Sequence, residues 1–288
     1  TPDIKVQAVK RLGGEVVLHG DSFDVANKYA IQCAQDEGMT FIPPYDDELV
    51  MAGQGTIANE ILRQWRDVEY VFVAVGGGGL IAGVAAYLGD VAPHVKVIPV
   101  EYDESACLKA AFEANERVIL PSVGLFADGT AVAQIGAKPF DVIRLQKSDN
   151  SGPIVERDVV LVNTDEICAA IKDTYDECRS IVEPSGAMAL AGIKKYVAEH
   201  GLENKNMVSI VCGANMNFDR LRYIAERTEL GERKEAIFAV TIPEEKGSFL
   251  NFCRALQGRN ITEFNYRAST SSAAQVFVGI SLKGGEKE

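Results

Sequence analysis

Four consecutive glycines, Gly76 to Gly79, are the residues whose type and spacing indicate chemistry most directly. They follow the apolar run 71–75 and open the helix-like run 80–87, which predicts a buried strand, a tight turn and a helix N-terminus. Glycines let backbone N–H groups converge without side-chain obstruction, and the helix dipole adds partial positive charge at the same point. The pattern therefore predicts a site for a phosphate group, carried by a cofactor or a substrate. The alternative is a close-packed turn that binds no ligand.

The same glycines also fit a dinucleotide-binding pattern. Gly77, Gly79 and Ala82 form G-x-G-x-x-A, and Glu101 stands at about the spacing expected of an acidic residue that binds a ribose. On this local evidence an NAD-dependent oxidoreductase is a rival interpretation. A third is a non-catalytic module in which the C-terminal segment binds an amino acid.

The composition restricts the class of protein and its partners. The chain has 288 residues, 47% of them hydrophobic, which is enough for a sizeable core. Its net charge of −12 argues against a nucleic-acid groove or an anionic membrane surface, and no apolar run approaches the length of a membrane span. Six cysteines without a Cys-x-x-Cys pair and only three histidines predict neither a metal site nor a disulfide framework. We expect a soluble protein of a reducing compartment, the cytoplasm or an organelle matrix.

Short apolar runs alternate with helical runs over the first three-quarters of the chain. Predicted helices cover 3–11, 21–37, 55–66, 80–87, 165–176 and 185–198, and predicted strands cover 15–18, 40–42, 70–75, 95–100 and 207–212. This alternation predicts an α/β fold, in which helices cover both faces of a parallel sheet and the crossovers are right-handed.

The pattern changes at about residue 233. A strand at 236–242, a helix at 247–256 and strands at 260–268 and 273–282 form β-α-β-β, which is half of a ferredoxin-like α+β unit. The sequence ends before the second helix and fourth strand of such a unit, and it begins at a helix cap rather than at methionine. We therefore expect a fragment that is cut at both ends.

Motifs spread over nearly the whole chain together resemble one enzyme family. They are Ile42-Pro43-Pro44-Tyr45-Asp46, Gly53-Gln54-Gly55-Thr56, Gly76 to Leu80, Phe126-Ala127-Asp128-Gly129, Glu183-Pro184-Ser185-Gly186-Ala187, Gly213-Ala214-Asn215-Met216-Asn217 and the run 241–249. In this order and spacing they closely resemble biosynthetic threonine dehydratase, also called threonine deaminase. The resemblance implies a pyridoxal-phosphate enzyme of the tryptophan-synthase-β fold type (fold type II) with a C-terminal ACT-like regulatory domain. It favours pyridoxal 5′-phosphate over a dinucleotide as the ligand of the glycines.

The resemblance also implies a domain division and the roles of individual residues. Residues 1–232 would be the catalytic domain, with about 1–45 the end of the small subdomain and about 46–232 the large one, and 233–288 would begin the regulatory domain. Gly76, Gly77, Gly78, Gly79 and Leu80 would form the phosphate cup. Cys212 would face the pyridine nitrogen, where close relatives usually carry serine, and Asp128-Gly129 and Ser185-Gly186 would line the site.

The activity implied is that of a lyase, which converts L-threonine to 2-oxobutanoate and ammonia in the first step of isoleucine biosynthesis. Isoleucine would be the allosteric effector, and the family's homotetramer would be the assembly. The Schiff-base lysine of the family is expected upstream of Thr1, so no catalytic residue is assigned here; Lys10, Lys28 and Lys109 lie on amphipathic runs typical of solvated faces. We expect this chain by itself to be inactive, and we interpret 148–157 as a surface insertion.

Overall fold

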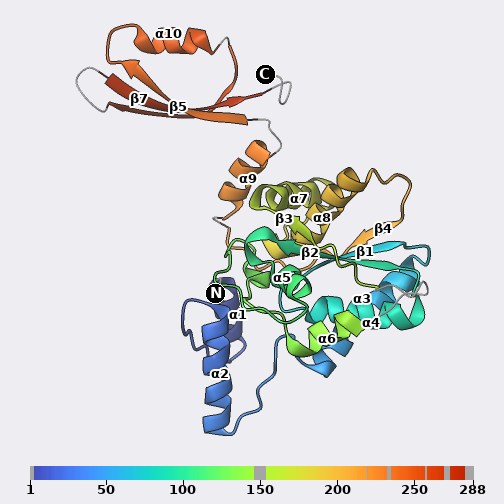
Figure 1. The fold of residues 1–288 in the computed structure, drawn as a ribbon. Helices are drawn as coiled ribbons and strands as arrows, with labels where there is room; N and C mark the ends of the chain where they lie inside the picture. Colours follow the sequence, from blue (N-terminus) through green and yellow to red (C-terminus); the bar gives the residue numbers. More distant parts are fainter. Residues whose placement is uncertain are drawn as a thin grey trace. The chain divides into compact units, whose positions relative to one another are not determined.

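The chain divides into two compact units, Thr1–Leu221 and Arg222–Glu288 (Figure 1). The structure is a computed structural model that describes residues 3–145, 154–218, 220–231, 235–256, 258–268 and 273–282. None of the helices in these ranges combines the length and the apolar character that crossing a membrane requires.

A parallel sheet with the strand order β3-β2-β1-β4 forms the centre of the first unit. The strands are β1 (Tyr70–Ala74), β2 (Lys96–Tyr102), β3 (Val160–Val162) and β4 (Met207–Ser209). Helices cover both faces of this sheet, with α3, α4 and α6 on one side and α7 and α8 on the other (Figure 1). Continuous apolar runs occupy 71–74 of β1 and 97–100 of β2, because both faces of these inner strands are buried. The predicted α/β class is confirmed.

Several helices of the first unit begin or end at recognisable caps. The helices of this unit are α1 (Asp3–Arg11), α2 (Phe23–Glu37), α3 (Glu48–Gln64), α4 (Gly79–Val91), α5 (Cys107–Ala114), α6 (Ala137–Leu145), α7 (Thr164–Cys178) and α8 (Pro184–His200), with short 3₁₀ turns at Asp103–Ser105 and Asp128–Thr130. Helix α9 (Arg220–Gly231) begins in the first unit and continues into the second. Asn163 and Glu166 form a capping box at α7, and Pro184 occupies the first turn of α8. Gly38 and Gly201 end α2 and α8 in the left-handed conformation.

Four sequence predictions of local structure are wrong. Residues 15–18 and 40–42 form no strand; both segments are largely exposed, and none of the strands in the described ranges pairs with them. Helix α3 begins at Glu48 rather than 55, because the Asp47 carboxylate accepts the N–H groups of Leu49 and Val50 (2.8 and 3.2 Å). Strand β4 ends at Ser209, three residues before Cys212.

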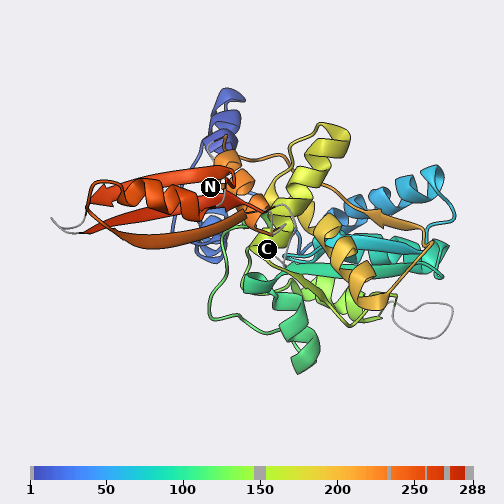
Figure 2. The ribbon, with the colours of Figure 1, turned by 90° about the horizontal axis from the view of Figure 1, so that it is seen from above.

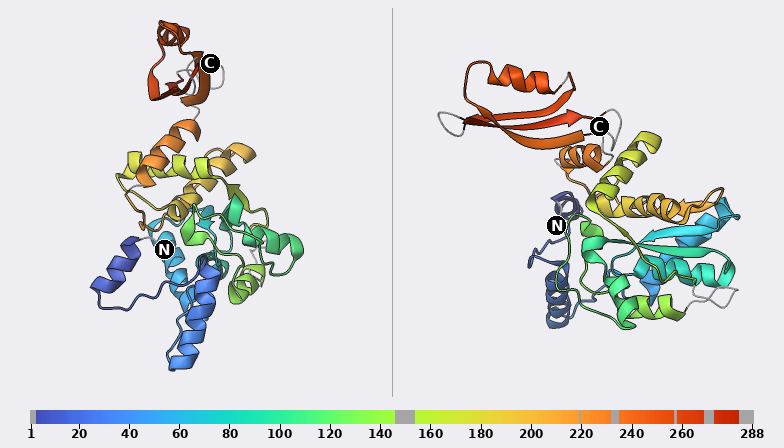
Figure 3. Two further views of the ribbon diagram at one scale, coloured as in Figure 1. Left: turned by 90° about the vertical axis from the view of Figure 1, so that its left-hand side faces the viewer. Right: turned by 45° about the horizontal axis from the view of Figure 1, so that its top comes forward.

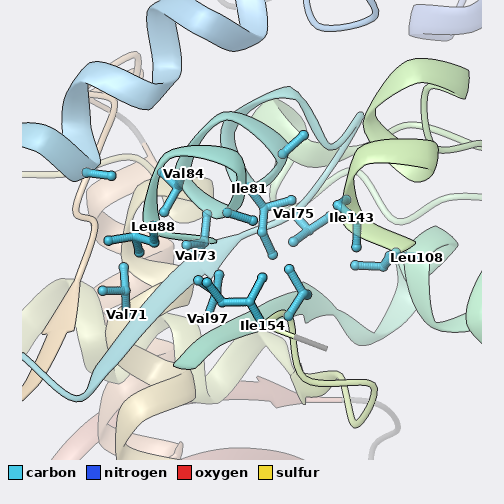
Figure 4. Packing of buried hydrophobic residues seen from close by; sticks show 14 of the residues in the cluster. Val71, Val73, Val75, Ile81, Val84, Leu88, Val97, Leu108, Ile143 and Ile154 are labelled. Atoms are coloured by element: carbon cyan, nitrogen blue, oxygen red, sulfur yellow. The ribbon is translucent and has the colours of Figure 1, made fainter. Parts of the chain in front are cut away.

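The core lies between the sheet and α4, where side chains from β1 face those of the helix (Figure 4). Labelled in that view are Val71, Val73, Val75, Ile81, Val84, Leu88, Val97, Leu108, Ile143 and Ile154. Part of the predicted surface insertion, 148–153, lies outside the described residues. Within its described part, Ile154 and Val155 do not fit a surface segment, because both are buried and Val97 donates its N–H to the Ile154 carbonyl (2.9 Å), whereas Arg157 is exposed as predicted.

The second unit is a three-stranded antiparallel sheet with one helix packed on it. Its elements are β5 (Glu235–Pro243), α10 (Ser248–Ala255), β6 (Ile261–Ala268) and β7 (Ala273–Ser281), with β7 in the centre. Helix α10 lies along one face of the sheet (Figure 2, Figure 3). Alternate residues of β7 lie buried on that face, and Phe252 of α10 packs against them. The predicted β-α-β-β order is confirmed.

Candidate functional site

One cavity of about 330 Å³ gathers the residues that the sequence singled out. Its wall includes all four glycines, Leu80 and Cys212, which lie far apart in the sequence of the first unit. Asp128, Gly129 and Ser185 also line it. The cavity lies where β1 passes into α4, that is, at the carboxyl end of a central strand, which is the usual ligand position in a parallel sheet.

The glycine turn, defined as residues 76–80, is packed tightly against other residues on the side where Cβ atoms would lie. Gly78 has φ +88° and caps α4 without a side chain. A Cβ on Gly76 would lie 2.8 Å from the Cα of Thr130, and a Cβ on Gly77 would lie 2.3 Å from the ring of Tyr45. The glycines are therefore required by packing, as the ligand-free alternative supposed. The first N–H groups of α4 have no carbonyl partner within the helix, and they belong to residues that line the cavity.

Ser185 supplies an independent sign of a ligand. Its side chain is buried, its Oγ lines the cavity, and that oxygen has no hydrogen-bond partner among the described residues. Buried hydroxyls in folded proteins are normally hydrogen-bonded, so an unpartnered one at a cavity wall fits a polar ligand. Ser185 also lies in the first turn of α8, whose N-terminal dipole adds positive potential. The site therefore fits an anionic, polar group such as a cofactor phosphate.

Cys212 lies in the loop after β4, and Glu183 holds that loop. The Glu183 carboxylate accepts the N–H of Asn215 (3.0 Å), while its own N–H donates to the Gly213 carbonyl (3.1 Å). A Cβ on Gly186 would lie 1.6 Å from the Cys212 carbonyl oxygen, so only glycine permits this contact. Partial burial of the thiol, followed by the Glu183 carboxylate, raises the pKa of Cys212, although part of the residue is open to the cavity. The thiol is therefore neutral at neutral pH.

Arg220 fixes the loop that carries Asp128, a role that no sequence pattern indicated. Its guanidinium lies 3.5 Å from the Asp128 carboxylate and donates to the Phe126 carbonyl (3.1 Å). The same group lies over the Phe126 ring, 5.5 Å from its centre. The next residue, Gly129, packs against Ser185: a Cβ there would lie 2.9 Å from Ser185 Oγ. Arg220 therefore helps to shape the wall that carries the unpartnered hydroxyl.

Glu101 caps a helix and does not bind a ribose. Its side chain is completely buried, and its carboxyl oxygens accept the N–H groups of Leu108 (2.7 Å) and Lys109 (2.9 Å) at the start of α5. Burial raises its pKa to about 7, against the opposing effect of those two hydrogen bonds. Cys107, beside it, donates its S–H to the Gly76 carbonyl (3.4 Å). The ribose-binding role on which the dinucleotide interpretation depended is contradicted.

None of the described lysines lines the cavity. Lys10 and Lys28 are exposed and Lys109 is half-buried on α5. Among the described residues, no three histidine, cysteine, aspartate or glutamate side chains are grouped so that they could hold a metal ion. The chemistry available from the described wall is therefore that of hydroxyl, thiol, carboxylate, side-chain amide and backbone amide groups.

Comparison with known proteins places the chain in a family. The family model for pyridoxal-phosphate dependent enzymes matches residues 1–213, and the model for the C-terminal regulatory domain of threonine dehydratase matches residues 226–288. The chain therefore belongs to the pyridoxal-phosphate-dependent enzymes, and its second unit carries the regulatory-domain match.

Within that family its similarity is to threonine dehydratases. It is 51% identical over 288 residues to the biosynthetic L-threonine dehydratase IlvA of Salmonella typhimurium, covering 100% of this chain and 54% of that protein. It is 50% identical over 287 residues to the mitochondrial threonine dehydratase of Schizosaccharomyces pombe, covering 98% and 46%. The chain thus spans about half the length of the curated relatives it matches. The resemblance inferred from its motifs is confirmed.

Solved structures give the same result for the fold. The processed form of threonine deaminase isoform 2 from Solanum lycopersicum aligns with a TM-score of 0.73 and 45% identity, over 80% of this chain and 61% of that one. Maize serine racemase aligns with a TM-score of 0.66 and 27% identity, over 77% and 67%. Neither the oxidoreductase nor the purely binding interpretation is supported by these likenesses.

Proposed function

We propose that this chain is part of a threonine dehydratase, which uses pyridoxal 5′-phosphate to convert L-threonine to 2-oxobutanoate and ammonia, as the first step of isoleucine biosynthesis. The observation that carries the proposal is the cavity itself. It joins a glycine turn at one helix N-terminus, an unpartnered buried hydroxyl at another, and a neutral thiol. The family match and the similarity to threonine dehydratases support the same activity.

Each wall group has a role in this proposal. The amides of Gly76, Gly77, Gly78, Gly79 and Leu80 bind the phosphate, because they meet at the positive end of α4. The Ser185 hydroxyl gains from the cofactor the hydrogen bond that it lacks. The Cys212 thiol faces the pyridine nitrogen as a neutral partner, which cannot hold that nitrogen firmly protonated as a carboxylate would.

The cofactor, when bound, delocalises the negative charge left on the substrate after its Cα proton is removed. The residues of this chain bind and orient it: the glycine turn fixes the phosphate end, and the loops at 128–129 and 212–215 enclose the ring end. We propose that the lysine that binds the cofactor covalently lies upstream of Thr1, since none of the described lysines lines the cavity.

We further propose the division 1–232 and 233–288 into catalytic and ACT-like regulatory domains, with about 1–45 and about 46–232 as subdomains. The compact units at Thr1–Leu221 and Arg222–Glu288 and the regulatory-domain match at 226–288 support this division. Isoleucine is the proposed effector and a homotetramer the proposed assembly. The relatives include bacterial and mitochondrial proteins, so a reducing cytoplasm or organelle matrix is the proposed compartment.

A pair of serine variants tests the site. Ser185 and Ser105 are both buried, but only Ser105 has a partner, because its Oγ donates to the Gly124 carbonyl (3.2 Å). Ser185→Ala should leave the thermal midpoint unchanged or higher and weaken binding of pyridoxal phosphate about threefold to tenfold. Ser105→Ala should lower the midpoint and leave the affinity unchanged. Equal affinities in both variants, measured by fluorescence titration, would remove Ser185 from the site.

The activity is measured on the protein as its gene encodes it. L-threonine should yield equal amounts of 2-oxobutanoate and ammonia, and isoleucine should inhibit the reaction. Removing residues 233–288, with any residues that follow them, should abolish that inhibition, because the deletion removes the segment through which the effector is proposed to shift the conformational equilibrium. If 2-oxobutanoate does not form, the proposed activity is wrong; if inhibition survives the deletion, the regulatory assignment is wrong.

A further inference from the structure

We propose that Asp46 is a positioning residue for the glycine turn. Asp46 ties the segment 43–47 to the start of α6. That segment and the start of α6 together hold the glycine turn in the conformation that directs its amides to the ligand. The inference rests on the proposed function, in which those amides bind the cofactor phosphate. Three sets of contacts carry it.

The first contact is a two-oxygen cap made across 91 residues of sequence. Asp46 Oδ2 accepts the N–H of Ala137, and Oδ1 accepts the N–H of Lys138, both at 2.9 Å. These amides open α6, so the carboxylate satisfies two helix N–H groups that have no partner within the helix. Both oxygens are engaged, which fixes the direction of the Asp46 side chain as well as its distance from α6.

The second contact joins the start of α6 to the glycine turn. Gly136, the residue before α6, donates its N–H to the Gly77 carbonyl (3.0 Å). A Cβ on Gly136 would lie 3.1 Å from Asp46 Cγ, so the carboxylate packs directly on the residue that makes this bond. The peptide that carries the Gly77 carbonyl also carries the Gly78 N–H, and a trans peptide directs these groups to opposite sides. Fixing the carbonyl on α6 therefore turns the Gly78 N–H away from α6.

The third contact is made by the neighbour of Asp46. The Tyr45 ring lies on Gly77, where an added Cβ would come within 2.3 Å of ring atoms, and the Tyr45 Cα lies 3.0 Å from the Cβ position of Gly79. Burial, and then the Asp24 carboxylate, raise the pKa of Tyr45 to about 12, so the phenol stays neutral while it packs there. Tyr45 thus presses on two glycines of the turn while Asp46 holds the same segment to α6.

The adjacent residue provides a matched control. Asp47 also caps a helix with its carboxylate, accepting the N–H groups of Leu49 and Val50 at α3, and it does not contact the glycine turn through these bonds. Asp46→Ala and Asp47→Ala lie at adjacent positions, and each removes two capping hydrogen bonds. A merely structural role for Asp46 predicts the same outcome for both.

The experiment is hydrogen exchange of the amides of residues 76–81 in the unliganded chain, together with thermal midpoints. Both variants should lose thermal stability, but only Asp46→Ala should speed exchange in 76–81, by about tenfold relative to Asp47→Ala. Pyridoxal phosphate should bind Asp46→Ala about tenfold more weakly than Asp47→Ala. Equal exchange in 76–81 in the two variants would overturn the proposal.

Two further variants keep the test decisive if Asp46→Ala does not fold. Asp46→Asn keeps one acceptor oxygen and should show an intermediate rise in exchange, and Tyr45→Phe should match the unaltered chain because the ring remains. The exchange measurement uses no ligand, so it is independent of the proposed function. If the unaltered chain fails to bind pyridoxal phosphate, the proposed function fails; if exchange is equal, the role of Asp46 fails.

Discussion

Replacing Glu101 by glutamine should change how the stability of the chain depends on pH. The carboxyl is completely inaccessible to solvent, and burial raises its pKa from 4.5 to about 7, although two backbone N–H groups of α5 oppose the shift. At a pH between these two values the folded protein holds a proton that the unfolded chain has released. Stability from this group is therefore fully present below about pH 4.5 and is lost as the pH rises through about 7.

The size of the effect follows from the shift. A displacement of about 2.5 pKa units at ~1.4 kcal/mol per unit gives ~3 kcal/mol of unfolding free energy lost across this range. Glutamine cannot titrate, so the variant lacks this loss. Glutamine places its amide NH₂ against one of the two N–H donors of α5, which lowers the unfolding free energy by ~1–3 kcal/mol at the acidic end of the pH range. The variant should therefore be the less stable protein at about pH 5, with its deficit disappearing by about pH 8.

The assay is urea unfolding at several values of pH, followed through the fluorescence of Trp65. This is the only tryptophan of the sequence and it lies in the first unit, so the signal does not report the second unit. Glu113→Gln, an exposed position on α5, the helix that Glu101 caps, is the control and should leave the pH dependence unchanged. A difference between the unaltered chain and Glu101→Gln that stays constant from about pH 5 to about pH 8 would refute the reasoning.

Further predictions concern the cavity wall. Gly78→Ala should cost ~1–3 kcal/mol in thermal or urea unfolding, because alanine is strained at φ +88° and its Cβ would lie 3.0 Å from Ile135; unchanged stability would contradict the turn geometry. Cys212→Ser should keep most activity in the intact protein and Cys212→Asp should lose it, and equal steady-state rates on L-threonine would exclude the ring-facing role. Arg220→Met should speed hydrogen exchange in 126–130, and unaltered exchange there would show that its contact with Asp128 holds nothing.

Mid-helix glycines explain why the sequence placed the start of α3 too late. The predicted helix began at Gly55, because glycine is unfavourable inside helices and favours a position at their ends. In the structure Gly55 lies where α3 crosses α4: its Cβ would be 3.1 Å from the Gly83 carbonyl oxygen, and a Cβ on Gly83 would be 2.1 Å from the Met51 carbonyl. The glycines permit close helix packing, which a local pattern cannot distinguish from a break. The capping side chain of Asp47 was the local signal for the true start.

Long-range contacts account for the parts of the site that the sequence did not predict. The glycine turn was predictable because a strand, a turn and a helix N-terminus follow one another in sequence. The role of Asp46 depends on amides 91 residues away, and that of Arg220 on a carbonyl 94 residues away. The predicted strands at 15–18 and 40–42 are wrong for the converse reason, since their composition suits a strand but no strand of the described part of the chain pairs with them.

The glycine turn meets two requirements on its two sides, and this affects how variants of it are interpreted. The Cβ directions of Gly76, Gly77 and Gly79 are filled by Thr130 and Tyr45, whereas the amides at the start of α4 open on the cavity. Any larger residue at these positions therefore damages packing whether or not a phosphate binds, so loss of cofactor affinity in a glycine variant does not identify the ligand contact. Ser185 is free of this ambiguity, because its hydroxyl contributes no hydrogen bond to the described fold. A loss of affinity without a loss of stability at Ser185 is thus the sharper evidence that the cavity binds the cofactor.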